Sequence, residues 1–133
     1  MSSIHLIIRI WHGWTTPDNA DAYEALLKSE IFVGIKDRHI PGYRGIQLLR
    51  RRLPKEVEFV TIMRFDSLDA VRLFAGDDYE VAVVPPKARA LLSHFDERSQ
   101  HYEEIVNQPE SSFKSDPGTK AGRIGYIDSL IRG

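Results

Sequence analysis

Arg9 and Trp11, with the neighbouring His12, are the residues near the N-terminus that could take part in chemistry. They belong to an apolar run over residues 4–14 that has the composition of a β-strand. Side chains alternate between the two faces of a strand, so Arg9 and Trp11 share one face. A cation beside an indole on an apolar surface is typical of a small-molecule pocket. The alternative is that Arg9 reaches solvent at a strand edge while Trp11 only packs.

His101 is the second residue with suitable chemistry. It shares a predicted strand face with Glu97 and Ser99, and it could act there as a base. The alternative is a structural polar pair across two strands. A buried Arg9 needs a partner, and we expect Glu97 to be that partner. The remaining residues of the expected binding site are Trp11, Tyr43, Gln47, Met63 and His94.

Metal chemistry is not expected. The five histidines have no metal-ligand spacing, and cysteine is absent. His12 is expected to be a structural histidine that faces the helices. We therefore expect neither a metal nor another cofactor.

Composition excludes two classes of partner. The net charge of −1 gives no field that would attract nucleic acid. The one basic run, residues 50–52 with Lys55, alternates between strand faces and has no aromatic platform beside it. No apolar run is long enough to span a bilayer, and the N-terminus lacks the pattern of a signal peptide. We expect a cytoplasmic protein with no nucleic-acid or membrane partner.

The predicted elements have the order of a ferredoxin-like, split β-α-β subunit of the α+β class. A helix should begin after Thr16, which can cap it, at Pro17, which suits the first helical position. A hairpin of two strands follows, joined by a short polar turn. The expected ranges are strand 4–14, helix 17–39, strands 43–53 and 57–65, helices 67–76 and 87–95, and strand 95–105. Residues 79–84 are ambiguous between a helical turn and a strand.

Such a sheet has helices on one face only, which predicts a homodimer. The face opposite the helices should be apolar and should pack against a second copy. The alternative is a monomer whose C-terminal segment folds over this face. We expect one domain over residues 1–105 and an extension over residues 106–133, composed of a linker and a docking segment. The residues expected on the uncovered face are Ile7, Trp11, Leu49, Phe59 and Met63.

Four segments resemble the antibiotic biosynthesis monooxygenase family over residues 4–104. They are IIRIWHGWTTPDNADAYEALL, IPGYRGIQLLRR, EFVTIMRFDSLDAVRLFAG and HFDERSQHYE. The resemblance implies a homodimer known as the dimeric α/β barrel, with a pocket between sheet and helices in each subunit. Some members oxidise aromatic compounds with molecular oxygen and no metal or flavin, and others degrade haem or quinols. The haem-degrading members use an Asn on the first strand, a Trp on the third and a helical His, of which only His94 has a rough counterpart here.

Two functions are consistent with these observations. The first is a cofactor-independent monooxygenase that acts on a small aromatic or quinone-like compound. In it Arg9 stabilises an anion, Trp11 forms a stacking wall and His101 is the base. The second is a non-catalytic homodimer that binds a small molecule or only assembles. An enclosed cavity in which Arg9 and a histidine converge would favour the enzyme.

Overall fold

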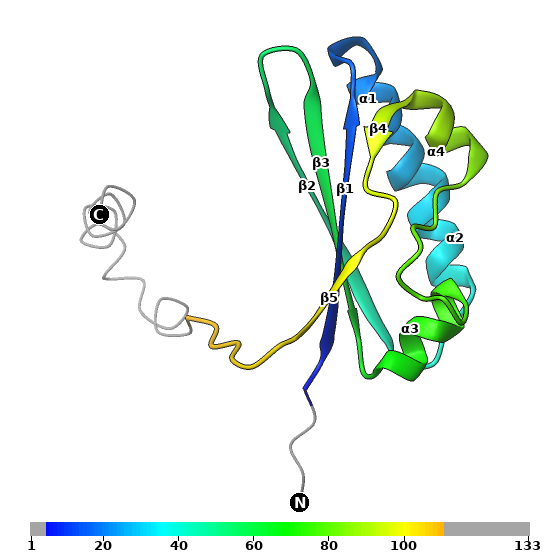
Figure 1. Ribbon diagram of the computed structural model, residues 1–133, viewed down its shortest axis with the longest axis vertical. Coiled ribbons are helices and arrows are strands. Elements are labelled where there is room, and N and C mark those ends of the chain that lie inside the picture. The colour runs from blue at the N-terminus through cyan, green and yellow to red at the C-terminus, as the bar shows by residue number, and fades with distance from the viewer. Residues whose placement is uncertain (1–4, 111–133) are drawn as a thin grey trace, which may run out of the picture.

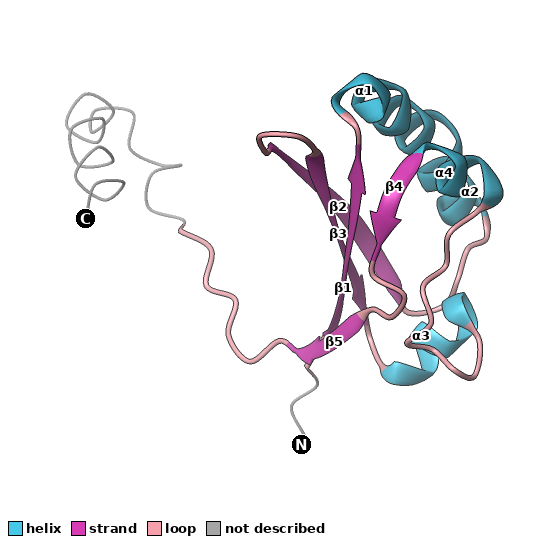
Figure 2. Cartoon of the chain, turned by 45° about the horizontal axis from the view of Figure 1, so that its top comes forward, coloured by secondary structure: helices cyan, strands magenta, loops and turns pink. Residues whose placement is uncertain are grey.

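The computed structural model describes residues 5–110, which form an antiparallel sheet with helices on one face (Figures 1 and 2). The strands run in the order β2-β3-β1-β4, and β5 also pairs with β1. The central strand β1 pairs with β3 along its whole length and with β4 and β5 on its other side. The strands are β1 (Ile7–Thr15), β2 (Tyr43–Arg52), β3 (Val57–Phe65), β4 (Leu92–Phe95) and β5 (Gln100–Glu103). This arrangement confirms the α+β, ferredoxin-like prediction.

The helices begin where the sequence predicts. The hydroxyl of Thr16 accepts a hydrogen bond from the backbone N–H of Asn19, and Pro17 occupies the first helical position. The expected long helix is divided into α1 (Pro17–Leu26), the π-helical turn η1 (Leu27–Ile31) and α2 (Phe32–Asp37). The other helices are α3 (Leu68–Ala75), capped by Ser67, and α4 (Pro86–Leu91).

The π-helical turn keeps one row of side chains on the sheet. Tyr23, Leu27, Ile31 and Ile35 are spaced by four residues. In a regular α-helix each step of four drifts by about 40° around the axis. The wider turn offsets part of this drift, so that all four residues line the same cavity. Single π-turns of this kind often lie at functional sites.

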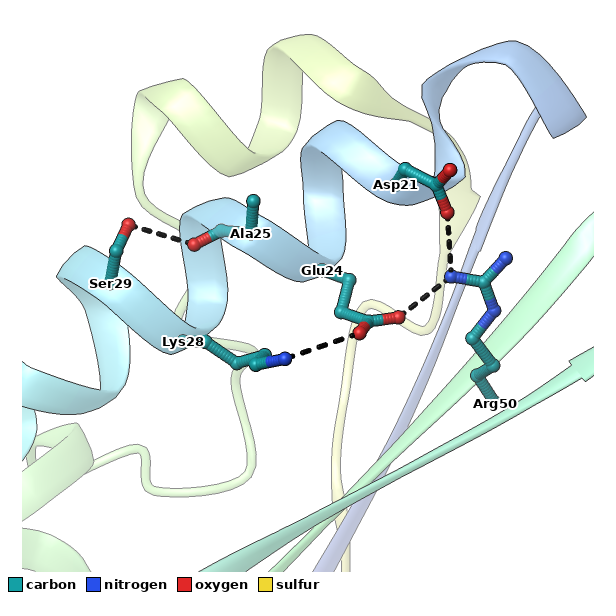
Figure 3. A network of polar contacts seen from close by, with 6 residues as sticks. All are labelled: Asp21, Glu24, Ala25, Lys28, Ser29 and Arg50. Atoms are coloured by element: carbon teal, nitrogen blue, oxygen red, sulfur yellow. Dashed lines mark hydrogen bonds and ion pairs between the residues drawn. The ribbon is translucent and has the colours of Figure 1, made fainter.

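Arg50 joins α1 to the edge strand β2 (Figure 3). Its Nη1 lies 2.7 Å from Glu24 Oε1 and 3.1 Å from Asp21 Oδ1. The hydrogen bond from Arg50 lowers the pKa of the Glu24 carboxyl. These groups are close to solvent, so this contact orients the helix more than it stabilises the fold.

The two faces of the sheet are the reverse of the prediction. Ile7, Trp11, Phe59 and Met63 lie on the face that the helices cover, and only Leu49 of the expected set lies on the open face. Both faces of β1 carry large apolar residues, so alternation alone did not decide between them. His12 consequently lies on the open face and not toward the helices.

The region after α4 also differs from the prediction. The expected helix ends at Leu91, and residues 92–95 form β4. The expected last strand is reduced to β5, and residues 79–84 are irregular except for a bridge between Val81 and Arg98. The predicted extension over residues 106–133, with its linker and docking segment, lies mostly outside the described residues.

Candidate functional site

A cavity lies between the sheet and the helices. The volume within it that the centre of a water molecule can occupy is about 60 Å³. The sheet contributes Arg9, Trp11, Thr61 and Met63, and the helices contribute an apolar wall that includes Leu27, Ile31 and Phe32. Residues 83–85 and Ser99 line a further side, and the cavity stays partly open to solvent. The cavity is therefore apolar over most of its surface and has a few polar groups, as small-molecule sites do.

Arg9 is the charged group of this cavity, and it is only 3% exposed. Its Nη1 donates to the carbonyl of Tyr79, and its Nη2 donates to the carbonyl of Val81 at 3.1 Å. The guanidinium also lies 5.4 Å from the centre of the Phe74 ring. Burial lowers the pKa of Arg9 to about 10, so the group stays charged at neutral pH. The prediction that Glu97 pairs with Arg9 is wrong. Glu97 is exposed, and backbone carbonyl oxygens accept the hydrogen bonds of Arg9 instead.

Arg9 keeps unused hydrogen-bonding capacity. A guanidinium carries five N–H groups. Contacts with Tyr79, Val81 and His101 use both N–H groups of Nη1 and one of Nη2. The Nε–H and one Nη2–H have no partner among the described residues. The cation therefore has donors left for a ligand.

His101 contacts Arg9 from β5. The two residues face each other across β1 and β5, and His101 Nε2 lies 3.0 Å from Arg9 Nη1. Arginine can only donate, so Nε2 accepts and the ring proton belongs on Nδ1. Burial, and then the charge of Arg9, lower the pKa of His101 to about 4, against a smaller opposing effect of Glu80. His101 is therefore neutral at pH 7, and its basic nitrogen is already occupied.

Trp11 forms one wall of the cavity and is held at two points. Its Nε1 donates to the carbonyl of Asp96 at 2.7 Å, and its ring lies 5.9 Å from the Phe95 ring. A Cβ atom at Gly13 would lie 2.8 Å from the Trp11 Cη2 atom. A glycine at this position therefore gives the indole room to lie along the strand.

Three predicted binding residues lie outside the cavity. Tyr43 is displaced by a register shift between Tyr43 and Gly45, and it lines a separate surface hollow beside α2. Gln47 is exposed on the open face. His94 lies on a strand instead of a helix, stacks on Trp14 at 4.4 Å and pairs with Glu56 at 2.9 Å. Of the predicted residues, Arg9, Trp11 and Met63 line the cavity and His101 contacts Arg9.

Ser99 is one of the lining residues with a hydroxyl group, with Thr61 and Tyr23, for which the sequence predicts no role in binding. From the sequence, Ser99 is predicted only to lie beside His101 on one strand face. Its alternation with His101 could have placed it toward the site, because Arg9 and His101 are paired and share a face. The irregular wall of residues 83–85 has no periodic signal that would have revealed it.

Two kinds of structural feature, a metal cluster and a membrane-spanning helix, are absent from the described residues. No group of three or more His, Cys, Asp or Glu side chains within residues 5–110 could hold a metal ion. No helix in that part of the chain is long and apolar enough to cross a membrane.

Several solved structures share this architecture. A proposed antibiotic biosynthesis monooxygenase from Nitrosomonas europaea has a TM-score of 0.57 at 10% identity, over 82% of this chain and 99% of that chain. One from Bacillus cereus has a TM-score of 0.56 at 13% identity, over 80% and 99%. The heme-degrader MhuD from Mycobacterium tuberculosis, with two hemes bound in its active site, has a TM-score of 0.50 at 15% identity, over 77% and 99%. No family model and no curated protein matches the sequence. The chain therefore has the fold of the antibiotic biosynthesis monooxygenase structures.

Proposed function

We propose that the protein is a cofactor-independent monooxygenase that acts on a small aromatic or quinone-like compound bound in the cavity between the sheet and the helices. The observation that carries the proposal is Arg9, a buried cation with no carboxylate partner among the described residues. A buried charge without a counter-charge is costly. An anionic ligand oxygen would supply that counter-charge.

The size of the cavity restricts the ligand. One water needs about 10–15 Å³ by this measure, so the space holds roughly four to six waters. Its volume of about 60 Å³ suits a single substituted ring better than a polycyclic compound. The apolar walls match the faces of such a ring, and Trp11 offers it a stacking surface.

The chemistry balances without a further reductant. A phenol that takes up one O₂ leaves as a quinone and one water, since one oxygen atom enters the ring and the ring supplies the electrons that reduce the other. Arg9 favours the phenolate, the form that gives electrons to oxygen, because a nearby positive charge lowers the pKa of an acid. The apolar walls shield the faces of the reacting ring from water.

We infer that His101 positions Arg9. Its Nε2 lone pair accepts from Arg9, and its Nδ1 has no hydrogen-bond partner. The role of His101 as the base stays a prediction, because Nε2 would have to release Arg9 before it could take a proton. Met63 packs against the ligand in this proposal, while Tyr43, Gln47 and His94 take no part.

Haem does not fit this cavity. No histidine among the described residues lines it, and a volume of about 60 Å³ is far too small for a porphyrin. His94, the rough counterpart of a helical ligand, lies on the open face against Trp14. Haem is therefore not part of the proposed function.

The test of the enzyme is oxygen uptake with a panel of single-ring phenols and quinols. We expect the wild type to consume one O₂ per substrate molecule and Arg9→Met to lose this activity. Arg52→Met, at an exposed arginine of β2, is the matched control and should keep it. Arg9→Lys keeps a charge in case the Met variant does not fold, and it should retain part of the activity. Equal rates in all four folded proteins would refute the proposal.

The second candidate is a homodimer that only binds or assembles, and the open face of the sheet favours it. Leu49 is 44% exposed there, and no element of residues 5–110 covers this face (Figure 2). Ile105 and Val106 follow β5 on a segment that leads away from the sheet, and each is 67% exposed (Figure 1). We propose that a second copy covers these apolar groups. Light scattering should give twice the chain mass of 15.2 kDa, and a monomer at micromolar concentration would refute the dimer.

A further inference from the structure

The hydroxyl of Ser99 is an unexplained polar group inside the candidate site. Ser99 is 3% exposed, and its Oγ has no hydrogen-bond partner. Leaving a buried hydroxyl unpaired costs free energy, so such a group in a native protein calls for an explanation. Ser99 lines the cavity, which means that a bound molecule could provide the missing partner.

Ser99 and Arg9 lie on the same side of the sheet. Arg9 pairs with His101 across β1 and β5, and Ser99 comes two residues before His101. Period-two alternation therefore turns Ser99 toward the helices, as it does Arg9 and His101. The backbone N–H of Ser99 donates to the carbonyl of Glu80, which fixes its main chain. The main chain of Ser99 is thus held in place, while its hydroxyl has no hydrogen-bond partner.

The groups around Arg9 include no negatively charged acceptor. The N–H donors of Arg9 that bind protein meet carbonyl oxygens and a neutral imidazole, so no anion among the described residues balances the guanidinium. The other lining residues are mostly apolar. Arg9, which has unused N–H donors, and Ser99 therefore line one cavity that has no negatively charged side chain in its wall.

We propose that Ser99 and Arg9 together form an oxyanion subsite, in which the Ser99 hydroxyl and a free N–H of Arg9 donate to the anionic oxygen group of a single-ring ligand. This inference rests on the proposed function and adds Ser99 as the residue that selects the ligand. The shared chemistry is an anionic oxygen on an aromatic ring, either a phenolate or a carboxylate. A hydrogen bond to a charged group is stronger than one to a neutral group, so Ser99 discriminates against the neutral ether of the same ring.

The experiment compares three probes: para-nitrophenol, para-nitrobenzoate and the neutral para-nitroanisole. Each is titrated into wild type, Ser99→Ala and the control Ser93→Ala, which makes the same change at an exposed serine of β4. We expect Ser99→Ala to weaken binding of the phenolate about tenfold, or ~1.4 kcal/mol. Binding of para-nitroanisole should stay within about twofold, because an ether has no charge for the subsite to bind.

Two further readouts separate ligand binding from structure. The visible absorbance of para-nitrophenolate should show that the wild type lowers the pKa of the bound phenol and that Ser99→Ala lowers it less. The melting temperature of Ser99→Ala should equal or exceed that of the wild type, because the substitution removes an unpaired hydroxyl. A marked fall in melting temperature would mean that Ser99 is structural, and it would overturn the proposal.

The remaining outcomes are equally decisive. Tighter, Ser99-dependent binding of para-nitrobenzoate would support the subsite and identify a carboxylate as its ligand group. Equal binding of every probe by Ser99→Ala and Ser93→Ala would overturn the subsite. If oxygen uptake still depends on Arg9 in that case, the proposed function stands and only the role of Ser99 falls. No binding of any probe by the wild type would overturn both.

Discussion

Acidification should weaken the protein through His101. Burial and the charge of Arg9 hold the pKa of this histidine at about 4 in the folded protein, whereas a free histidine has a pKa of 6.5. Between these values the unfolded chain binds more protons than the folded one, so stability falls as the pH falls. Above pH 6.5 the ring is neutral in both states and there is no penalty. Below pH 4 the full penalty applies.

The magnitude follows from the pKa difference. A difference of about 2.5 units corresponds to ~3.4 kcal/mol. The ring of His101 is only partly buried, so solvent screening reduces the expected effect to ~1.5–2 kcal/mol. The loss should also loosen residues 79–81, because a protonated His101 can no longer accept from the Arg9 Nη1 that bonds to Tyr79.

The assay is urea unfolding of wild type and His101→Gln at pH 7.5, 6.5, 5.5 and 4.5. Glutamine can accept from Arg9 through its amide oxygen but does not titrate. The carboxylates titrate in both proteins, so their contribution cancels in the difference. We expect the stability advantage of the wild type to shrink by ~1–1.5 kcal/mol between pH 7.5 and 4.5, because the full penalty is reached only below pH 4. A difference that stays constant with pH would refute the reasoning, and His39→Gln, at an exposed histidine, should behave as the wild type does.

Four other substitutions have defined outcomes. Gly13→Ala should lower the free energy of unfolding by ~1–3 kcal/mol and alter tryptophan fluorescence, because its Cβ would lie 2.8 Å from Trp11. Gly34→Ala has no atom within 4 Å of its Cβ, so it should stabilise its helix by up to ~1 kcal/mol. Leu49→Glu should shift the mass in light scattering from dimer to monomer while the melting of the subunit stays cooperative; an unchanged mass would exclude this face as the interface. Arg50→Met should lower the free energy of unfolding by less than ~1 kcal/mol, and this loss should be smaller in high salt. A loss that does not depend on salt would mean that Arg50 stabilises the contact with α1 by packing as well as by charge.

Local signals in the sequence predicted most of the elements. The cap of Thr16, the proline at position 17 and the short turn between β2 and β3 each specify structure over a few residues, and each prediction is confirmed. The boundary of α4 was missed. Residues 92–95 have an apolar pattern that suits either a helix or a strand, and pairing with β1 decides in favour of the strand.

The site was predicted less completely, because its residues depend on which face of the sheet the helices cover. Alternation correctly grouped Arg9 with Trp11, but it could not say that their face is the covered one. The prediction that Met63 shares this face with Trp11 rests on the same alternation and is confirmed, because Met63 pairs with Arg9. Gln47 and His94 were misplaced because one lies on the opposite face and the other lies on a strand in place of the expected helix. To place Ser99 in the site from the sequence, one must know that β1 pairs with β5. This is a long-range contact that no local pattern encodes.

The most direct test of the proposed site uses the two tryptophans of the chain. Trp11 lines the cavity, whereas Trp14 lies on the open face and stacks on His94. Their indole N–H groups give separate signals in a ¹H–¹⁵N spectrum. Titration with para-nitrophenol should shift the Trp11 signal and leave Trp14 in place. A shift of Trp14 with Trp11 unchanged would contradict a ligand site between the sheet and the helices.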